Sequence, residues 1–353
     1  MVLDRDTHSP RRSVRLVTWR LGSLALAGVV LASCASTSSV SGAAPLTGVP
    51  SIGISVPLQQ VACTSNNSCV AVGATSASLG PSTVGEYRLG SGRWIPLAVP
   101  SAVAAQMTTA SCWSTGCLLA GAQATGDLLW SYQSATHSVN VLTAPTGGVD
   151  VSALDCYAAL SCIMLDLDAS GHARITSTLD GGVSWTSPTN LDWASGDSVT
   201  TLACHSVNDC LVGATTATNQ TVVEVTHDAG FTWTALTTPS AWTSLTSLTC
   251  HVRSCVGLAA TADGSRIVRT TTFGRVWHGV TIPAKNAALA CSALQHCVAV
   301  GTSSAGSPWL AQVTHDVVTP RALKYVPSPL LDVACGTTTC AAIGVTTLLA
   351  LKP

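Results

Sequence analysis

Residues 202–211 read Leu-Ala-Cys-His-Ser-Val-Asn-Asp-Cys-Leu, with two cysteines that flank a short polar stretch. The chain of 353 residues repeats this pattern six more times, and successive pairs begin 41 to 49 residues apart. A repeat of this length indicates an array of similar supersecondary units. The seven pairs are Cys63 with Cys69, Cys112 with Cys117, Cys156 with Cys162, Cys204 with Cys210, Cys250 with Cys255, Cys291 with Cys297, and Cys335 with Cys340.

Each cysteine pair is expected beside the turn of a β-hairpin. An apolar residue stands two positions before the first cysteine and another directly after the second, as Leu202 and Leu211 do. Apolar residues that alternate on both sides of a short turn are typical of two paired strands. We therefore predict one disulfide within each pair, bridging the two strands.

Zinc binding is the competing interpretation of these cysteines, because His205, His251 and His296 lie close to them. No two pairs adjoin in the way that a four-cysteine zinc site requires. Repeated local cysteine pairs in a chain with an N-terminal export signal, described next, favour disulfides instead, because disulfides persist in oxidising compartments. We expect no zinc and no cofactor.

The N-terminus has the pattern of an export signal. Arginines at positions 11, 12, 15 and 20 accompany an apolar run at 21–32 that is too short to be a stable membrane span. The run ends in Leu31-Ala32-Ser33-Cys34, which resembles the lipobox of bacterial lipoproteins. The resemblance implies that the chain is cut after residue 33 and that the Cys34 thiol is acylated. The protein would then be anchored to the outer face of the bacterial cell membrane; an ordinary secretory peptide is the alternative.

The chain accordingly divides into a signal peptide (1–33), a flexible tether (34–45) and one folded domain (46–353). After residue 34 no apolar run reaches the length of a membrane span, and 47% hydrophobic content is enough for a core. A net charge of −1, with scattered lysines and arginines, gives no basic face for nucleic acid. We expect a monomer.

A second motif follows the cysteine pairs in the middle of the chain. Residues 178–185 read Thr-Leu-Asp-Gly-Gly-Val-Ser-Trp, and residues 226–233 read Thr-His-Asp-Ala-Gly-Phe-Thr-Trp. Residues 270–277 keep Gly274 and Trp277 but have Thr272 in place of the aspartate. The first two stretches resemble the Asp-box of BNR-type β-propellers. In such a turn the carboxylate accepts backbone N–H bonds, the glycine takes a positive φ and the tryptophan packs beneath.

This resemblance implies an all-β fold: a seven-bladed β-propeller with four-stranded antiparallel blades and one disulfide per blade. Each repeat supplies two strands around the cysteine pair, a third before the Asp-box and a fourth after it. The last repeat ends too early for a fourth strand. We expect residues 51–57 from the N-terminus to complete it and close the ring.

Asp-box propellers include sialidases, sortilin-type receptors and photosystem II assembly factor-like proteins. The sialidase pattern is missing here: there is no Phe-Arg-Ile-Pro motif, and Glu86 and Glu224 are the only glutamates. Glu86 adjoins Tyr87 on one expected strand, so the two side chains point to opposite faces and cannot pair. We expect a non-catalytic binding or assembly module for a protein or glycan partner. A secreted sialidase-like glycoside hydrolase is the alternative.

Binding is expected on the face opposite the disulfides and Asp-boxes, where the longer connections lie. These connections are residues 74–83, 166–171, 192–197, 239–243 and 263–266. Trp193, Trp242 and Arg266 are the predicted anchors at the channel mouth, with Asp192 and Asp263 as polar companions. The alternative is that both tryptophans fill gaps between neighbouring blades.

Asp166, Asp168 and Ser170 resemble the first ligands of a calcium loop. The twelfth position of that loop is Ser177, where a bidentate glutamate is required. A plain turn between two strands is therefore favoured over a calcium site.

Overall fold

The computed structural model describes residues 46–47, 49–50, 58–73, 83–88, 94–97, 105–123, 125–191, 193, 197–324, 326, 328–344 and 347–351. The chain divides into two units, Met1–Gly42 and Ala43–Pro353, and every described residue belongs to the second. Its regular structure is β throughout. Among these residues no helix has the length and apolar character needed to cross a membrane.

Six sheets each contain four consecutive strands, which we call blades. The first blade has β3 (Leu58–Cys63), β4 (Ser68–Gly73), β5 (Thr83–Arg88) and β6 (Trp94–Pro96). The second has β7 (Ala105–Cys112), β8 (Gly116–Gln123), β9 (Gly126–Gln133) and β10 (Ser138–Leu142). The third has β11 (Gly148–Ala158), β12 (Ser161–Asp168), β13 (Ala173–Thr178) and β14 (Thr189–Asn190).

The fourth blade has β15 (Ser198–Cys204), β16 (Cys210–Thr215), β17 (Thr221–Thr226) and β18 (Thr234–Leu236). The fifth has β19 (Trp242–His251), β20 (Ser254–Thr261), β21 (Gly264–Thr270) and β22 (His278–Ile282). The sixth has β23 (Ala284–Ala293), β24 (His296–Ser303), β25 (Pro308–Thr314) and β26 (Val317–Pro320). All pairings within these blades are antiparallel, so each blade is a meander.

The expectation of a seven-bladed propeller is corrected by this topology. Six four-stranded blades, not seven, are built from consecutive strands. The remaining sheet is composite: β28 (Leu330–Cys335), β29 (Cys340–Gly344) and β30 (Thr347–Leu351) are joined by β2 (Val49–Pro50) from the N-terminus. The expected closing strand, residues 51–57, lies outside the described residues. A parallel pair, β1 (Leu46–Thr47) with β27 (Leu323–Lys324), was also not foreseen.

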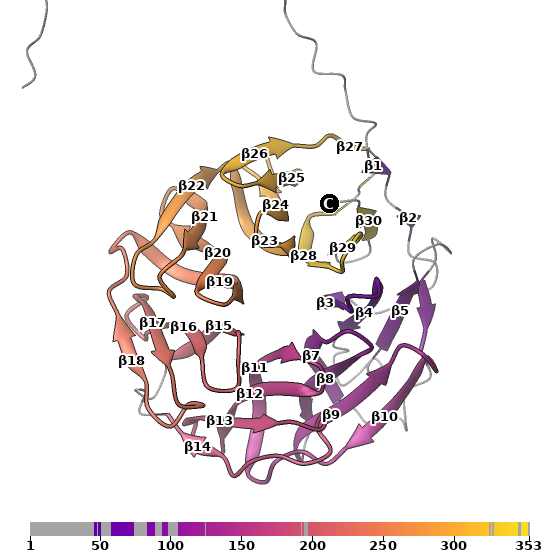
Figure 1. Cartoon of the computed structure of the whole chain (residues 1–353). Coiled ribbons are helices and arrows are strands. Elements are labelled where there is room, and N and C mark those ends of the chain that lie inside the picture. The colour runs from indigo at the N-terminus through magenta and orange to yellow at the C-terminus, as the bar shows by residue number, and fades with distance from the viewer. Residues whose placement is uncertain are drawn as a thin grey trace, which may run out of the picture. The chain divides into compact units, whose positions relative to one another are not determined.

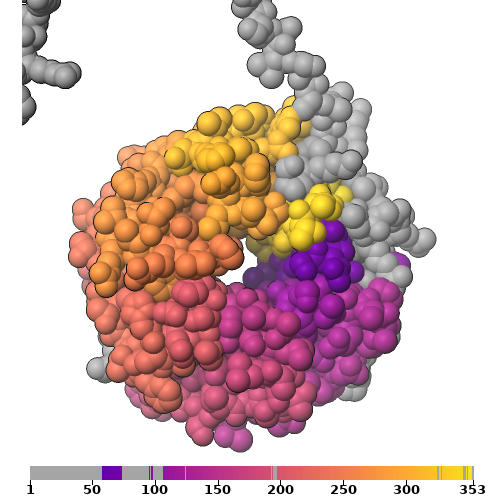
Figure 2. Space-filling view, viewed as in Figure 1, coloured from indigo at the N-terminus to yellow at the C-terminus, as the bar shows by residue number. Residues whose placement is uncertain are grey.

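The blades follow one another around a ring whose innermost strands face the centre (Figure 1). Each of the seven apolar clusters of the core lies between two neighbouring sheets rather than within one. One of them packs Leu58 and Val61 of the first blade against Ala341 and Ile343 of the composite blade, and so closes the ring. Figure 2 shows that a hollow remains at the centre.

The predicted disulfide connectivity is confirmed in full, because every bond joins the two cysteines of one pair. Cys204 and Cys210 are direct partners in the ladder between β15 and β16, and the Cα atoms of each pair are 3.9–4.1 Å apart. Each bond therefore ties the innermost strand of a sheet to the next strand. The seven bonds join Cys63 to Cys69, Cys112 to Cys117, Cys156 to Cys162, Cys204 to Cys210, Cys250 to Cys255, Cys291 to Cys297, and Cys335 to Cys340.

The two cysteines of a pair differ in their surroundings. The second cysteine begins or nearly begins the second strand of its sheet and is buried in the core between blades. Cys117 and Cys162 have no exposed surface, and Cys255 and Cys297 are 1% and 2% exposed. The first cysteine lies on the innermost strand, where Cys112, like several others, is only partly buried. Four disulfides, those that begin at Cys63, Cys112, Cys291 and Cys335, thus reach from the central channel into the packed core, whereas Cys156 and Cys204 are themselves buried.

Candidate binding channel

The innermost strands β3, β7, β11, β15, β19, β23 and β28 border a central channel of about 600 Å³. Successive residues of a strand point to opposite faces, and both faces of an inner strand pack against neighbouring blades, as Val61 and Ala62 do in two different apolar clusters. Small hydroxyl side chains at bulges of the inner strands, among them Thr108, Ser152 and Thr200, line the channel. Two carboxylates, Asp155 and Asp332, also line it.

Polar side chains of the inner strands join neighbouring blades. At five junctions a side-chain oxygen of one inner strand accepts a hydrogen bond from a backbone N–H of the next inner strand. The pairs are Asp332 Oδ2 with Val61 N (2.9 Å), Gln60 Oε1 with Ala110 N (2.7 Å), Ser111 Oγ with Cys156 N (2.9 Å), Asp155 Oδ2 with Cys204 N (2.6 Å) and Thr201 Oγ1 with Leu248 N (3.1 Å). The Asp332 bond spans the junction between the composite blade and the first.

Both channel carboxylates titrate above their ordinary range. Burial raises the pKa of Asp155 to about 6, against the lowering effect of the Cys204 N–H. Burial likewise raises the pKa of Asp332 to about 7, although the backbone N–H groups of Val61 and Val333 favour its charged form. A carboxylate at either position therefore costs free energy of folding near neutral pH.

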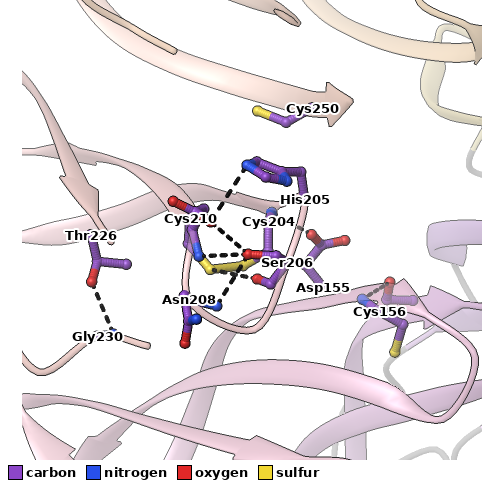
Figure 3. The surroundings of a disulfide bond; sticks show 12 residues. Asp155, Cys156, Cys204, His205, Ser206, Asn208, Cys210, Thr226, Gly230 and Cys250 are labelled. Carbon is purple, nitrogen blue, oxygen red and sulfur yellow. Dashed lines mark hydrogen bonds and ion pairs between the residues drawn. A yellow bond between two sulfur atoms is a disulfide. The ribbon is translucent and has the colours of Figure 1, made fainter. Parts of the chain in front are cut away.

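The side chains around the channel mouth on the disulfide side differ from blade to blade. The residue after the first cysteine of each pair is aromatic or imidazole in four successive blades: Trp113, Tyr157, His205 and His251. A side hollow of about 230 Å³ lies among Asp155, Tyr157, His205 and His251. Figure 3 shows Asp155 and His205 near the Cys204–Cys210 bond.

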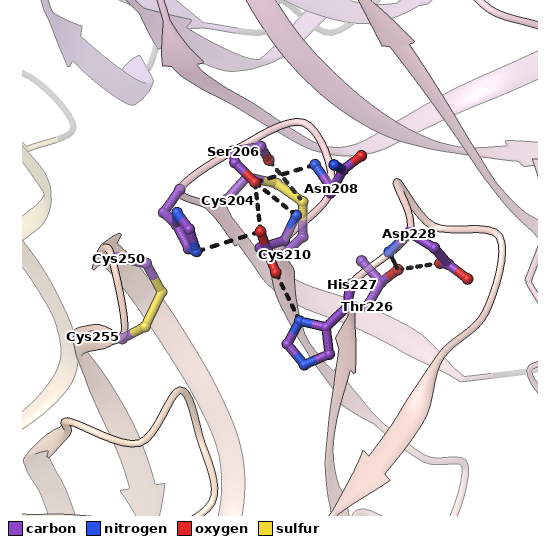
Figure 4. A network of polar contacts seen from close by, with 11 residues as sticks. Cys204, Ser206, Asn208, Cys210, Thr226, His227, Asp228, Cys250 and Cys255 are labelled. Carbon is purple, nitrogen blue, oxygen red and sulfur yellow. Dashed lines mark hydrogen bonds and ion pairs between the residues drawn. A yellow bond between two sulfur atoms is a disulfide. The ribbon is translucent and has the colours of Figure 1, made fainter.

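A polar network continues outward from this mouth along the fourth blade (Figure 4). Asp209 Oδ1 is 2.7 Å from His227 Nδ1, and its Oδ2 accepts a bond from Ser206 Oγ at 2.7 Å. Burial alone would raise the pKa of Asp209, but the hydrogen bonds from His227 and Ser206 hold it below its usual value. The edge of Phe273 packs on the His205 ring, with centroids 5.4 Å apart.

The two predicted tryptophan anchors pack into the fold. Trp242 is 6% exposed and stacks edge-to-face on Trp277, with ring centroids 5.5 Å apart. Trp193 is half-buried against the core between the third and fourth blades, and its Nε1 donates to Glu224 Oε2 at 2.6 Å. The interpretation of gap-filling between blades therefore describes both residues better than that of ligand anchors.

Two of the other predicted binding residues, Arg266 and Asp263, lie at the start of β21, away from the channel lining. Arg266 lies on β21 and donates from Nη2 to the carbonyl of Gly279 on the outermost strand, 3.1 Å away. Asp263 is exposed in the turn between β20 and β21. Asp192 and the lipidation candidate Cys34 lie outside the described residues.

The calcium candidates are occupied by groups of the chain itself. Asp168 Oδ1 accepts bonds from the backbone N–H groups of Ser170 (2.8 Å) and His172 (2.9 Å), as in a plain turn. Asp166 is 1% exposed and receives both Nε and Nη2 of Arg174, at 2.9 and 2.6 Å. Burial, and then the charge of Asp166, raise the pKa of neighbouring Asp127 to about 8. A buried charge cluster thus joins the second and third blades.

Comparison with solved structures agrees with this architecture. YCF48 from Cyanidioschyzon merolae superposes with a TM-score of 0.62 at 13% identity, over 88% of this chain and 99% of that one. YCF48 bound to D1 peptide gives 0.62 at 14% identity, over 88% and 95%. A catalytically inactive virginiamycin B lyase from Staphylococcus aureus, solved with quinupristin, gives 0.63 at 10% identity, over 87% and 99%. The fold is a β-propeller.

Identities this low show the propeller architecture alone. No protein-family model matches the chain, and no curated protein matches it by sequence. Function has to be argued from the channel.

Sequence reasoning missed the two channel carboxylates. Asp155 stands directly before the first cysteine of its repeat and Asp332 three positions before its own. Both positions adjoin the apolar one that stands two residues before that cysteine, which alignment of the seven repeats reveals. The prediction instead used the long connections, because loops are the usual carriers of function.

Proposed function

We propose that this propeller is a lipid-anchored, extracytoplasmic binding or assembly module that holds a protein partner without transforming it. The observation that carries the proposal is the central channel, which is open, polar and lined by residues from every inner strand. A rigid ring with such a channel presents fixed contacts to a partner at little conformational cost. The YCF48 structure with a D1 peptide offers a precedent for peptide binding on this fold.

The anchor belongs to the same proposal and rests on the lipobox-like residues 31–34. Acylated Cys34 would keep the propeller within about 40 Å of the membrane, since twelve extended residues reach no further. Membership of the BNR-type propellers is part of the same proposal and is supported by the turns that resemble Asp-boxes.

The glycoside hydrolase alternative has less support. Retaining enzymes of this class need two carboxyls about 5 Å apart beside the substrate. Asp155 and Asp332 stand on the third and the composite blades, which are not neighbours. Asp127 and Asp166 do lie together, but both are buried, and Asp166 is bound by Arg174.

Affinity capture from the native envelope tests the function, with the tagged full chain as bait and mass spectrometry of what it retains. We expect one partner that also binds the purified chain in a two-component assay. Recovery of a chemically altered partner or glycan would contradict a purely binding role. Mass spectrometry of the mature N-terminus tests the anchor; an unmodified N-terminus at another residue would refute it.

A further inference from the structure

Two channel positions carry a charge that the fold does not require. At five blade junctions a side chain accepts one backbone hydrogen bond, and Gln60, Ser111 and Thr201 do so without charge. Asp155 and Asp332 perform the same task with carboxylates. A neutral acceptor would serve equally well at these two positions.

The charge is also costly where it stands. Burial raises the pKa of both groups, to about 6 and about 7, which means that the folded protein disfavours their ionised forms. An asparagine would keep a carbonyl oxygen for the same bond and avoid this cost. Stability of the ring therefore does not explain why these two positions carry carboxylates.

The channel supplies no counter-charge of its own. Its lining, as far as the chain is described, contains no lysine, arginine or histidine. The Thr108 hydroxyl oxygen, also in the lining, is shielded from solvent and has no hydrogen-bond partner among the described residues. Charges of one sign inside a low-dielectric wall focus the field along the cavity and attract an ion of opposite sign.

We propose that the channel receives basic side chains, lysine ammonium or arginine guanidinium groups, from an extended segment of the partner, with Asp155 and Asp332 each accepting one of them. This inference rests on the proposed binding function and names the chemistry of the partner. Tyr157 stands at the mouth beside Asp155, where its ring can contact the cation or its alkyl stem. A metal ion fits less well, because no group of three or more His, Cys, Asp or Glu side chains in the described residues could hold one.

Fluorescence anisotropy with labelled hexalysine tests the proposal on the full chain in mild detergent, with labelled hexaglutamate as the reference probe. We expect hexalysine alone to bind. Asp155→Asn and Asp332→Asn should each weaken binding about tenfold or more, because each removes a desolvated charge but keeps the blade-joining bond. Gln60→Glu should strengthen it, since it adds a third carboxylate at an equivalent junction. Asp263→Asn, an exposed carboxylate outside the channel lining, is the matched control and should change nothing.

The outcomes separate the two proposals. If wild type does not bind hexalysine, or if the double Asn variant melts normally and still binds it, the channel inference is wrong even where affinity capture has found a partner. Equal weakening by Asp263→Asn would reveal diffuse surface attraction and also overturn it. If the Asn variants do not fold, failure of Gln60→Glu to raise affinity decides against the inference.

Discussion

The turns of the third and fourth blades and the turn of the fifth reach one backbone shape by different means. Asp180 Oδ1 accepts from Ser184 N at 2.9 Å, and Asp180 Oδ2 accepts from Ser184 Oγ at 2.5 Å. In the fifth blade Thr272 Oγ1 replaces the carboxylate and accepts from Val276 N at 2.9 Å. The aspartate is therefore one way to hold this turn and not a condition for it.

Glycine is what the three turns share. Gly182, Gly230 and Gly274 have φ values of 91°, 88° and 85°, and each donates from its backbone N–H to the hydroxyl oxygen of the threonine that begins the turn. A Cβ at each glycine would press on the preceding blade: on Leu142 at 2.8 Å, on Ile175 at 2.7 Å and on Leu236 at 2.6 Å. Glycine is required in these turns because each turn packs closely against the preceding blade.

The largest effect is expected from Gly230→Ala. The left-handed backbone and the contact with Ile175 should together cost about 2–3 kcal/mol of unfolding free energy, measured by chemical denaturation. Gly171→Ala is the matched control, because its φ is 79° but nothing lies within 4 Å of an added Cβ. It should cost only about 1 kcal/mol. An equal loss of unfolding free energy in both variants would show that the contact between Gly230 and the preceding blade does not contribute.

Removal of the Asp228 carboxylate should lower the stability more than removal of the Thr272 hydroxyl that replaces it in the fifth blade. Asp228→Ala removes bonds to Thr226 Oγ1, Thr232 N and Thr232 Oγ1. Thr272→Ala removes the bond from Val276 N and the contact with Thr270. Because bonds to a charged acceptor are roughly twice as strong, the melting temperature should fall about twice as far for Asp228→Ala. A larger fall for Thr272→Ala would reverse the comparison.

The tryptophans of the two kinds of turn should respond differently to phenylalanine. Trp233 Nε1 donates to the carbonyl of Gly230 at 3.1 Å, so Trp233→Phe should cost about 1 kcal/mol beyond the lost packing. Trp277 Nε1 is buried and has no hydrogen-bond partner in the described part of the chain. Trp277→Phe removes an unsatisfied donor and should be close to neutral. Chemical denaturation of Trp233→Phe and Trp277→Phe tests this prediction, and an equal loss of unfolding free energy in both variants would contradict it.

The smallest effect is a shift in acid stability. Hydrogen bonds from the Ser184 hydroxyl, the Ser184 N–H and the Thr178 hydroxyl lower the pKa of Asp180 to about 2. Since the unfolded value is near 4, this stabilisation is complete above about pH 4 and is lost as the pH falls toward 2. Asp180→Asn should melt below wild type near pH 5, and the gap should narrow near pH 2. A gap that does not change with pH would refute this assignment.

The repeats predicted much of the fold and little of the site. Cysteine spacing and the apolar residues around each pair located the hairpins and their bonds, because Cys204 and Cys210 are also ladder partners. An N-terminal strand does join the last sheet, as predicted, but β2 itself was not foreseen, because it is only two residues long and carries no periodicity of its own. Trp242 was a plausible anchor from its position in a connection, but burial depends on the neighbouring blade, which supplies Trp277 only in three dimensions. The partner of Asp332 could not be predicted for the same reason, because Val61 lies 271 residues away.

The locality of the disulfides has a consequence for biogenesis. Every cysteine of a pair finds its partner five or six residues along the chain. Under the export that we propose, each hairpin can therefore oxidise as soon as it leaves the export machinery, before the ring exists, because the nearest free thiol is that of its correct partner. Closure of the ring comes late instead, because β2 pairs with β30, which lies about 300 residues further along the chain. We expect export to deliver a string of oxidised hairpins whose last folding event joins the two ends.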